Sequence, residues 1–367
     1  MEAVKVGFLG VRRGRALVMA AKNFCKNIEI EVICDKNKEL ADKVGAEAEA
    51  KKIVYDYDEL LMSDVDAIVI ATPIPDHAEH VVAALEAGKH VLSEVHAATT
   101  LEDCERIQAA VKKSGKKYMM EENYCFYRPL SIVHNMIKDG QLGDVYYAES
   151  DYLMDFHLRP GFPEVAGEWR KETYFGTKGH PYITHSLGPL CYIMNERIAS
   201  VTCQTAGEYP IFKADRLCIL LLKTESGKLI RLRSSFLSPR PNVYTYYSFQ
   251  GTKGCYEGQV GPNDNHRVHV RGLCGDHEWK NVFDFKEYYP DFWDIFPEGH
   301  FDDTVDDCRS KFDSGLPVLM KAFADSIIND TTPPIDVGMA LNWTAAGILS
   351  GVSAENGGVP IEVPLFR

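Results

Sequence analysis

The apolar positions in the first third of the chain form short continuous runs, separated by stretches with helical spacing. The runs predicted as strands are residues 4–10, 28–35, 66–73, 90–95 and 117–122. Between them, residues 76–88 and 100–115 carry apolar side chains three and four positions apart, as amphipathic helices do. Apolar strands that alternate with helices are typical of a parallel, doubly wound sheet. We therefore expect an N-terminal α/β domain over residues 1–123.

From about Val145 the pattern changes to longer strand candidates that are rich in aromatic residues. These candidates are residues 144–153, 216–224, 228–236 and 245–258, with glycine-containing turns between them. Such segments are typical of a mostly antiparallel sheet. Helical spacing returns near the end of the chain. We expect an α+β domain with an open sheet over residues 124–367, in which residues 335–367 can pack back on the first domain.

Composition narrows the classes of partner. The 367 residues suffice for two cores, and the net charge of −13 disfavours nucleic acid and anionic membranes as partners. We find neither a signal-peptide pattern nor a membrane-spanning run, so we expect a cytoplasmic protein with a small-molecule ligand. Ten cysteines without C-x-x-C or zinc spacing are expected to be buried thiols.

Gly10 follows the first predicted strand, and Gly14 stands where we expect a helix to begin. A dinucleotide fingerprint places glycines so that the backbone approaches a pyrophosphate at a helix N-terminus. Arg12 occupies the second glycine position of that fingerprint, so an ordinary glycine turn is the alternative. Asp35, after the next strand, favours a Rossmann domain that binds NAD, because its carboxylate would accept hydrogen bonds from ribose and repel a 2′-phosphate. Arg13, with Arg12, could nevertheless hold a phosphate.

Further cofactor contacts are expected where later strands end, since open α/β sheets bind ligands at the carboxyl edge. Glu94 is expected to face the nicotinamide side. The full predicted cofactor-binding set is Gly10, Arg12, Arg13, Asp35, Thr72, Pro73, His77, Glu94 and Asn123.

Several segments together resemble the Gfo/Idh/MocA family of NAD(P)-dependent sugar oxidoreductases. They are Ala71-Thr72-Pro73 with His77, "AGKHVLSE", "SFQGTKGCYEG" and "AENGGVPIEVP", and the resemblance covers essentially the whole chain. Most members carry Glu-Lys-Pro after "AGKHV", and the lysine helps to take the proton of the substrate hydroxyl. This chain has Glu94-Val95-His96, so that lysine is absent.

Glu-Val at this place is similar to the NAD-dependent glycosidases typified by α-N-acetylgalactosaminidase. The segments "EENYCFYR", "AESDYLMD", "GEWR" and "YITHSLGP" support the closer likeness. This resemblance implies that a sugar pocket is lined by Glu122, Tyr152, Arg170, Tyr182 and His185. It also implies oxidation of a ring hydroxyl, usually at C3, by hydride transfer to NAD⁺, after which the C2 proton becomes acidic.

We expect His185 to be the base, because an imidazole with a pKa near 6.5 accepts a proton at neutral pH. Tyr182 is expected one helical turn earlier on the same face, whereas a histidine packed inside a helix is the alternative. The resemblance implies that Tyr152 takes the C2 proton, for which it needs a cation such as Arg170. A core aromatic is the other interpretation of Tyr152.

Glu122 is expected to bind sugar hydroxyls or to cap the next helix. His96 either reaches the pocket or caps a helix that starts near Thr99, and we favour the structural role. Further substrate-binding candidates are His180, His157 and Trp169, with His300 as another histidine of interest. The histidine spacing matches no metal-ligand pattern, so we predict no metal.

We therefore expect an NAD-dependent enzyme that oxidises a sugar or glycoside hydroxyl, with the catalytic residues His185, Tyr152 and Tyr182. One alternative is a redox-neutral glycosidase that uses the same oxidation as its first step. Another is a cofactor-binding sensor without catalysis, which the incomplete glycine motif and the missing lysine would favour. Apolar strands such as "RLCILLLKT" also predict a homo-oligomer formed through the open sheet.

Overall fold

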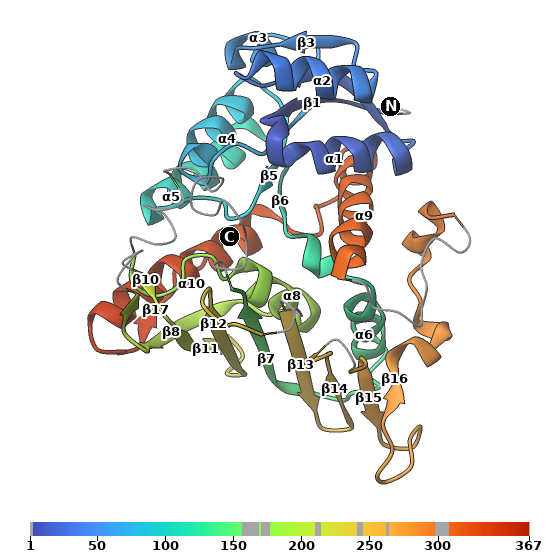
Figure 1. The fold of residues 1–367 in the computed structure, drawn as a ribbon, viewed down its shortest axis with the longest axis vertical. Helices are drawn as coiled ribbons and strands as arrows, with labels where there is room; N and C mark the ends of the chain where they lie inside the picture. Colours follow the sequence, from blue (N-terminus) through green and yellow to red (C-terminus); the bar gives the residue numbers. More distant parts are fainter. Residues whose placement is uncertain are drawn as a thin grey trace.

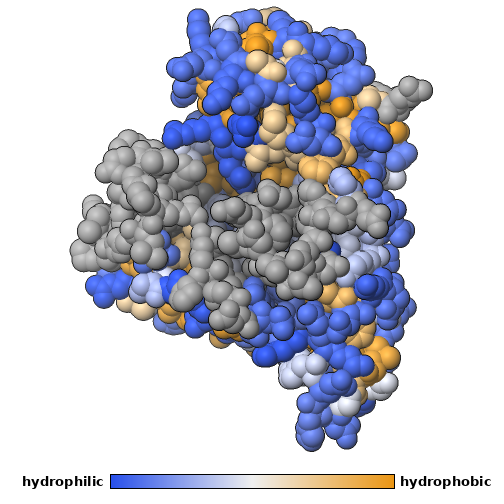
Figure 2. Space-filling view, turned by 45° about the vertical axis from the view of Figure 1, so that its right-hand side comes forward, coloured by the Kyte–Doolittle hydropathy of each residue, from blue (hydrophilic) through white to orange (hydrophobic). Residues whose placement is uncertain are grey.

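The computed structural model describes residues 3–155, 169, 177–209, 214–240, 245–261, 264–297 and 308–366. Figure 1 shows a parallel sheet with its helices at one end of the molecule and a wide open sheet at the other. In the space-filling view of Figure 2, the visible surface around the first sheet is mainly hydrophilic, because the apolar strands of this sheet are inside.

The first sheet has six parallel strands in the order β3-β2-β1-β4-β5-β6. Its strands are β1 (Val4–Leu9), β2 (Ile28–Cys34), β3 (Lys52–Val54), β4 (Ala67–Ile70), β5 (His90–Glu94) and β6 (Tyr118–Glu121). Its helices are α1 (Val11–Phe24), α2 (Lys38–Ala48), α3 (Tyr57–Leu61), α4 (His77–Glu86) and α5 (Leu101–Ser114). The predicted Rossmann-type architecture is confirmed.

Local sequence explains where these elements begin and end. All four residues of β4 are buried, as expected for a central strand covered by helices on both faces. At the start of α5, the side chain of Thr100 accepts a hydrogen bond from the backbone N–H of Asp103. The same helix ends at Gly115, whose φ of 65° lies in the left-handed region that glycine tolerates.

The second sheet has nine strands in the order β16-β15-β14-β13-β7-β12-β11-β8-β17. Its longer strands are β7 (Val145–Leu153), β8 (Ile198–Thr205), β11 (Cys218–Thr224), β12 (Leu229–Ser235) and β13 (Thr245–Gly251). The shorter ones are β14 (Gly254–Glu257), β15 (Arg267–Val270), β16 (Lys280–Asn281) and β17 (Ile361–Glu362). Only the β7–β12 pair is parallel, so the predicted, mostly antiparallel open sheet is confirmed.

Helices cover the face of this sheet that is turned toward the first sheet (Figure 1). They are α6 (Arg128–Lys138), α8 (Thr184–Met194) and α10 (Val337–Glu355). Helix α10 packs on β8 and also contacts α5 and β6, whereas α9 (Cys308–Ile328) crosses back to pack on α1. Helix α10 is long and apolar enough to cross a membrane, but most of it is buried in the core.

The opposite face of the nine-stranded sheet is more polar than expected. Arg231 Nε lies 2.7 Å from Glu149 Oε2, its Nη2 lies 3.1 Å from Asp151 Oδ1, and Arg233 also pairs with Asp151. The apolar side chains of β11 alternate, so that most are buried and Leu221 is 46% exposed. We expected β11 to be apolar on both faces. This expectation was wrong, because most of its apolar side chains lie on the face that packs in the core.

Candidate active site

The turn between β1 and α1 packs closely against the backbone of the turn after β4. Gly10 has a φ of 81°, and a Cβ there would lie 2.8 Å from the carbonyl oxygen of Ala71 and 3.1 Å from the backbone nitrogen of Thr72. Helix α1 begins directly at Val11, so Gly14 lies in its first turn and not at its start. The free N–H groups of this helix end suit a pyrophosphate.

Asp35 stands directly after β2, beside the same turn. Its Oδ2 accepts a hydrogen bond from Val11 N at 2.8 Å, and its Oδ1 accepts one from Asn37 N at 2.9 Å. These bonds fix the carboxylate next to the start of α1. A carboxylate held at this position fits the ribose of an adenosine half that lies over β2.

Arg13 does not stand beside that ribose position. Its Nε lies 2.7 Å from Glu94 Oε1 at the end of β5, and the sheet order separates β5 from β2 by β1 and β4. The carboxylate of Glu94 raises the pKa of Arg13. Arg12 is exposed. Arg13 is thus paired with Glu94, away from the ribose position beside Asp35. Of the two arginines that could have held the 2′-phosphate of NADP, Arg12 remains a candidate.

His77 differs from the prediction that it contacts the cofactor. Its ring is fully buried, with Nε2 at 2.9 Å from the carbonyl oxygen of Thr72 and Nδ1 at 2.8 Å from that of His96. Both nitrogens therefore face the protein, and the side chain ties the turn after β4 to the turn after β5. Thr72 and Pro73 form the first of these turns, and the Thr72 hydroxyl lies 3.0 Å from His80 Nδ1.

The centre of the site is a hydrogen-bonded chain of three side chains. His185 Nδ1 lies 2.8 Å from Glu122 Oε1 and 3.0 Å from Oε2, while its Nε2 lies 2.8 Å from the hydroxyl oxygen of Tyr182. The carboxylate accepts from Nδ1–H, so Nε2 carries the lone pair and accepts from the phenol. A carboxylate that orients an imidazole in this way also stabilises the imidazolium that forms when Nε2 takes up a proton.

Glu122 therefore does not offer its oxygens to a sugar hydroxyl, contrary to one of our expectations. The residue is fully buried, and its Oε1 also accepts from Tyr124 N at 3.3 Å, which caps the short helix η2 (Asn123–Phe126). The neighbouring Asn123 is fully buried, with no hydrogen-bond partner for its side-chain amide among the described residues. The geometry assigns Glu122 to His185 and to the cap.

Close packing brings α8 to the end of β6. A Cβ on Gly188 would lie 2.9 Å from Glu122 Cγ and 3.0 Å from Trp343 Cζ3, so only glycine lets α8 come near enough for the histidine contact. Tyr182 precedes α8, which begins at Thr184, so the expected placement of both residues on one helical face is wrong. Tyr182 reaches the imidazole from the segment before the helix.

That segment is held against α10. A Cβ on Gly347 would lie 2.5 Å from the carbonyl oxygen of Pro181, and one on Gly351 would lie 2.7 Å from that of Lys178. The backbone N–H of His180 donates to Ser350 Oγ at 2.9 Å. The glycine face of α10 is therefore what places His180 and the residues that follow it.

Aromatic rings surround the imidazole of His185. The ring of Tyr152, on β7, has its centroid 5.8 Å from that of His185 and 6.2 Å from that of Tyr182. Tyr124 approaches from the other side at 4.8 Å. The structure thus brings together the three predicted catalytic residues, and their roles stay predictions.

His96 and His180 are buried in the same neighbourhood. His96 does not cap α5, since Thr100 does, and its Nδ1 lies 2.7 Å from the carbonyl oxygen of Ala98. Its ring centroid is 6.4 Å from that of Tyr182. The ring of His180 packs against that of Phe236 with the centroids 4.8 Å apart and the planes tilted by 37°. Within the part of the chain that the structure describes, His96 Nε2 and both ring nitrogens of His180 have no hydrogen-bond partner.

The structure does not describe every predicted site residue. His157, Arg170 and His300 lie outside the described residues, and Trp169 is half-buried. No group of three or more potential metal ligands occurs in the described ranges. Sequence reasoning missed Glu121, Tyr124 and Tyr247, whose hydroxyl donates to the backbone carbonyl of His185. The adjacent acids in "EENY" were a signal for Glu121.

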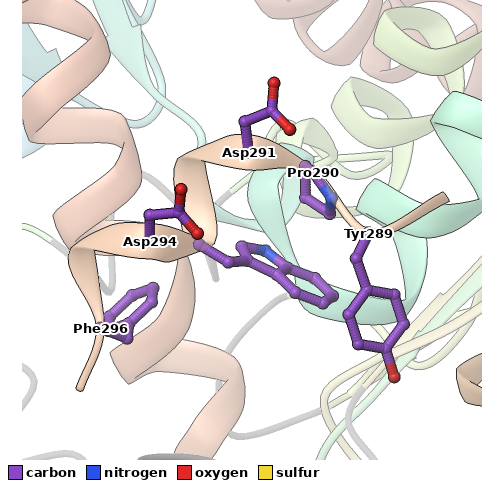
Figure 3. A pocket seen from close by; sticks show the side chains of 6 residues that line it. Tyr289, Pro290, Asp291, Asp294 and Phe296 are labelled. Carbon is purple, nitrogen blue, oxygen red and sulfur yellow. The ribbon is translucent and has the colours of Figure 1, made fainter. Parts of the chain in front are cut away.

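Figure 3 shows a depression elsewhere on the molecule, at the short helix η6 (Asp291–Ile295). Its lining is Tyr289, Pro290, Asp291, Trp293, Asp294 and Phe296. The guanidinium of Arg128 lies 4.6 Å from the Trp293 ring centroid. None of the predicted site residues lines it.

Comparison with known proteins decides the family. Residues 4–122 match the family described as "Oxidoreductase family, NAD-binding Rossmann fold", and residues 131–257 match "GFO/IDH/MocA C-terminal domain". Residues 205–367 match "Glycosyl hydrolase 109, C-terminal domain". A glycosyl hydrolase family 109 protein of Shewanella sp. (strain ANA-3) is 31% identical over 330 residues, 79% of this chain and 69% of that protein. The chain belongs to the glycosyl hydrolase 109 branch of the Gfo/Idh/MocA family.

Other relatives agree with this family. An α-N-acetylgalactosaminidase from Shewanella oneidensis is 31% identical over 299 residues, 70% of this chain and 63% of that protein. A levoglucosan dehydrogenase complex with NADH and levoglucosan has a TM-score of 0.81 at 19% identity, covering 99% of this chain and all of that one (100%). A scyllo-inositol dehydrogenase from Lactobacillus casei has a TM-score of 0.76 at 17% identity, and the match covers 98% of this chain and 99% of that one.

Membership in the family establishes an enzyme of the NAD-dependent oxidoreductase type with NAD as its cofactor. The residues present fit that cofactor, since the turn at Gly10 leads directly into the N-terminus of α1 and the carboxylate of Asp35 is held beside it. The adenosine half fits beside Asp35, and the pyrophosphate fits at the start of α1.

Proposed function

We propose that the protein oxidises a ring hydroxyl, at C3, of a sugar or glycoside to the keto-sugar. The observation that carries this proposal is the chain from Glu122 through His185 to the Tyr182 hydroxyl. It supplies a base to a chain in which Val95, at the position of the family's lysine, has no group that moves a proton. Cofactor binding nearby, at the edge of the first sheet, supplies the partner for the oxidation.

The protein's own part in the reaction is proton removal and positioning. Tyr182 is partly exposed, whereas His185 is buried, so the phenol is the member of the chain that meets the sugar hydroxyl. As the C–H bond breaks, the hydroxyl proton passes to the Tyr182 oxygen, and the phenol proton passes to His185 Nε2. Glu122 stabilises the resulting imidazolium. NAD accepts the hydride when it is bound.

A redox-neutral glycosidase is the second candidate, and the position of Tyr152 favours it. Its phenol lies in the same aromatic cluster, as a second acid–base group beside His185. Once C3 is a ketone, the C2 proton is acidic. The phenolate form of Tyr152 would accept that proton, and the glycosidic oxygen would leave C1 with the bonding electrons and take up a proton from solvent. A relative that is named as an α-N-acetylgalactosaminidase also supports this second candidate. Family membership and the intact base argue against a non-catalytic sensor.

A panel of p-nitrophenyl glycosides incubated with NAD⁺ separates these functions. The proposal predicts a keto-glycoside, seen by mass spectrometry, together with one NADH per product. A glycosidase would release nitrophenol with only catalytic NAD⁺ present. Neither product from any sugar of the panel would contradict both.

We also propose that the open face of the nine-stranded sheet joins a second copy of the chain. Leu221 and Leu229 are 46% and 44% exposed on this face, beside the ion pairs of Arg231 and Glu149. Exposed leucines next to half-buried ion pairs suit an interface with an apolar centre and polar contacts. Sedimentation velocity at micromolar concentration should show a dimer or tetramer, and Leu221→Glu should dissociate it. A wild-type monomer would contradict this.

A further inference from the structure

Two glutamates meet at the carboxyl edge of the first sheet, and one of them has no role in the site described so far. Glu94 is the last residue of β5 and Glu121 is the last residue of β6. They are register partners in this parallel pair. Register partners point to the same face of a sheet at the strand spacing of about 4.8 Å, so the two carboxyl groups are neighbours.

Among the described residues, Arg13 is the arginine or lysine that lies beside these two acids. Arg13 Nε lies 2.7 Å from Glu94 Oε1, and Glu94 Oε2 accepts from Val95 N at 3.2 Å. Glu121 is fully buried, and no N–H or hydroxyl group of another described residue donates a hydrogen bond to either of its oxygens. Other ionisable groups nearby are Glu122, His185, His77, Tyr182 and Tyr124.

Two buried carboxylates this close cannot both be ionised beside a single guanidinium. Glu94 keeps its charge because Arg13 contacts it directly, which leaves the proton on Glu121. Burial and the charge of Glu94 raise the pKa of Glu121 well above its ordinary value. Burial alone would do the same to Glu94, but that pKa is lowered, chiefly by the charge of Arg13.

The pair lies on the side of the edge that the adenosine half of NAD does not use. Asp35 follows β2, Gly10 follows β1, and the sheet continues through β4 to β5 and β6. A dinucleotide with its ribose at Asp35 and its pyrophosphate at Gly10 therefore extends its nicotinamide half toward Glu94 and Glu121.

We propose that Glu121 carries a proton that it donates in a hydrogen bond to Glu94, and that this acid pair couples the binding of oxidised cofactor to proton release. The nicotinamide ring of NAD⁺ is a cation, whereas that of NADH is neutral. A cation that approaches the pair favours the ionised form of Glu121, whose proton then leaves to solvent. NADH adds no such charge, so the pair distinguishes the two redox states of the cofactor. The inference rests on NAD binding and not on which hydroxyl is oxidised.

Calorimetry in buffers of different ionisation enthalpy tests the proposal, because it counts the protons released on binding without any turnover. We expect wild-type protein to release a measurable fraction of a proton with NAD⁺ between pH 6 and 9, and much less with NADH. Glu121→Gln keeps the shape and a donor but cannot ionise, so the difference between NAD⁺ and NADH should disappear. Glu105→Gln, at an exposed position of α5, is the matched control and should behave as wild type.

A second readout checks the resting state and does not depend on cofactor. Infrared difference spectra of wild type against Glu121→Gln should show the C=O band of a protonated carboxylic acid at neutral pH. Absence of that band, or unchanged proton release by the Gln variant, would overturn the proposal. Failure to oxidise any sugar would leave both measurements intact.

Discussion

His185 and His180 lie five residues apart and are both buried, but they differ in the hydrogen bonds of their ring nitrogens. Both nitrogens of His185 are within 3 Å of a side-chain partner, Glu122 on one side and Tyr182 on the other. Both nitrogens of His180 lack a partner among the described residues, and the same is true of His96 Nε2. The first imidazole is oriented before substrate arrives, as a base must be. The ring nitrogens of His180 and Nε2 of His96 can still form hydrogen bonds with a ligand.

An imidazole that is buried without partners costs stability unless a ligand completes its bonds. Burial lowers the pKa of His180 to about 3 and that of His96 to about 4, so both are neutral at pH 7. Neutral imidazoles suit hydroxyl groups, which both donate and accept hydrogen bonds. We therefore expect His185 to move a proton and the other two histidines to bind a neutral sugar.

The largest expected effect comes from His185→Ala. Removing the base should lower the single-turnover rate of NAD⁺ reduction by about 10²–10⁴, because a positioned base contributes that range. NAD affinity, measured by fluorescence titration, should stay nearly unchanged, which places the loss in the chemical step. A rate within threefold of wild type would remove His185 from its role.

Glu122→Gln should have the next largest effect. The amide preserves shape, but it no longer stabilises an imidazolium, so the rate should fall by about 10–100-fold. The reason predicts a signature as well: kcat should fall while KM stays nearly unchanged, because the carboxylate of Glu122 is bonded to His185 and we expect it to act through that ring. A wild-type kcat would show that Glu122 only packs and caps.

Acidification should act on the other two histidines. Their folded pKa values lie below the unfolded value near 6.5, so the unfolded chain binds more protons and stability falls as pH drops from about 6.5 toward 4. The loss at pH 5 is about 2 kcal/mol for each fully buried imidazole. Urea unfolding at pH 7 and pH 5 should therefore show a smaller pH dependence in His180→Asn than in wild type. An identical dependence would mean that His180 is not buried neutral.

The smallest expected effect is that of His96→Ala. One of its nitrogens is already bonded to Ala98, so only Nε2 is left for a ligand, and a single hydrogen bond is worth about 1 kcal/mol. We expect KM to rise about fivefold with little change in kcat. If His96→Ala cost more in kcat than His185→Ala, the histidine after Val95 would be the base.

The cofactor half of the site could be predicted from sequence because local patterns determine it. Gly10 and Asp35 each stand at the end of an apolar strand, and parallel strands bring their carboxyl ends to one edge. The sugar half could not, because it depends on contacts between distant segments. Gly188 admits α8 to Glu122, and glycines of α10 hold the segment of Tyr182, which no spacing in the chain reveals. The cap of α5 at Thr100 likewise displaced the role we favoured for His96.

Helix α9 packs on α1, although α1 is synthesised first and α9 is synthesised near the end of the chain. Helix α1 leaves the ribosome early, with Leu17 and Val18 among its buried residues, yet α9 is made only after most of the second sheet. Until then the nascent first sheet presents the face of α1 that α9 later covers. A chain released before residue 308 would lack α9 and leave exposed the surface of α1 that α9 covers, which would make the chain prone to aggregate.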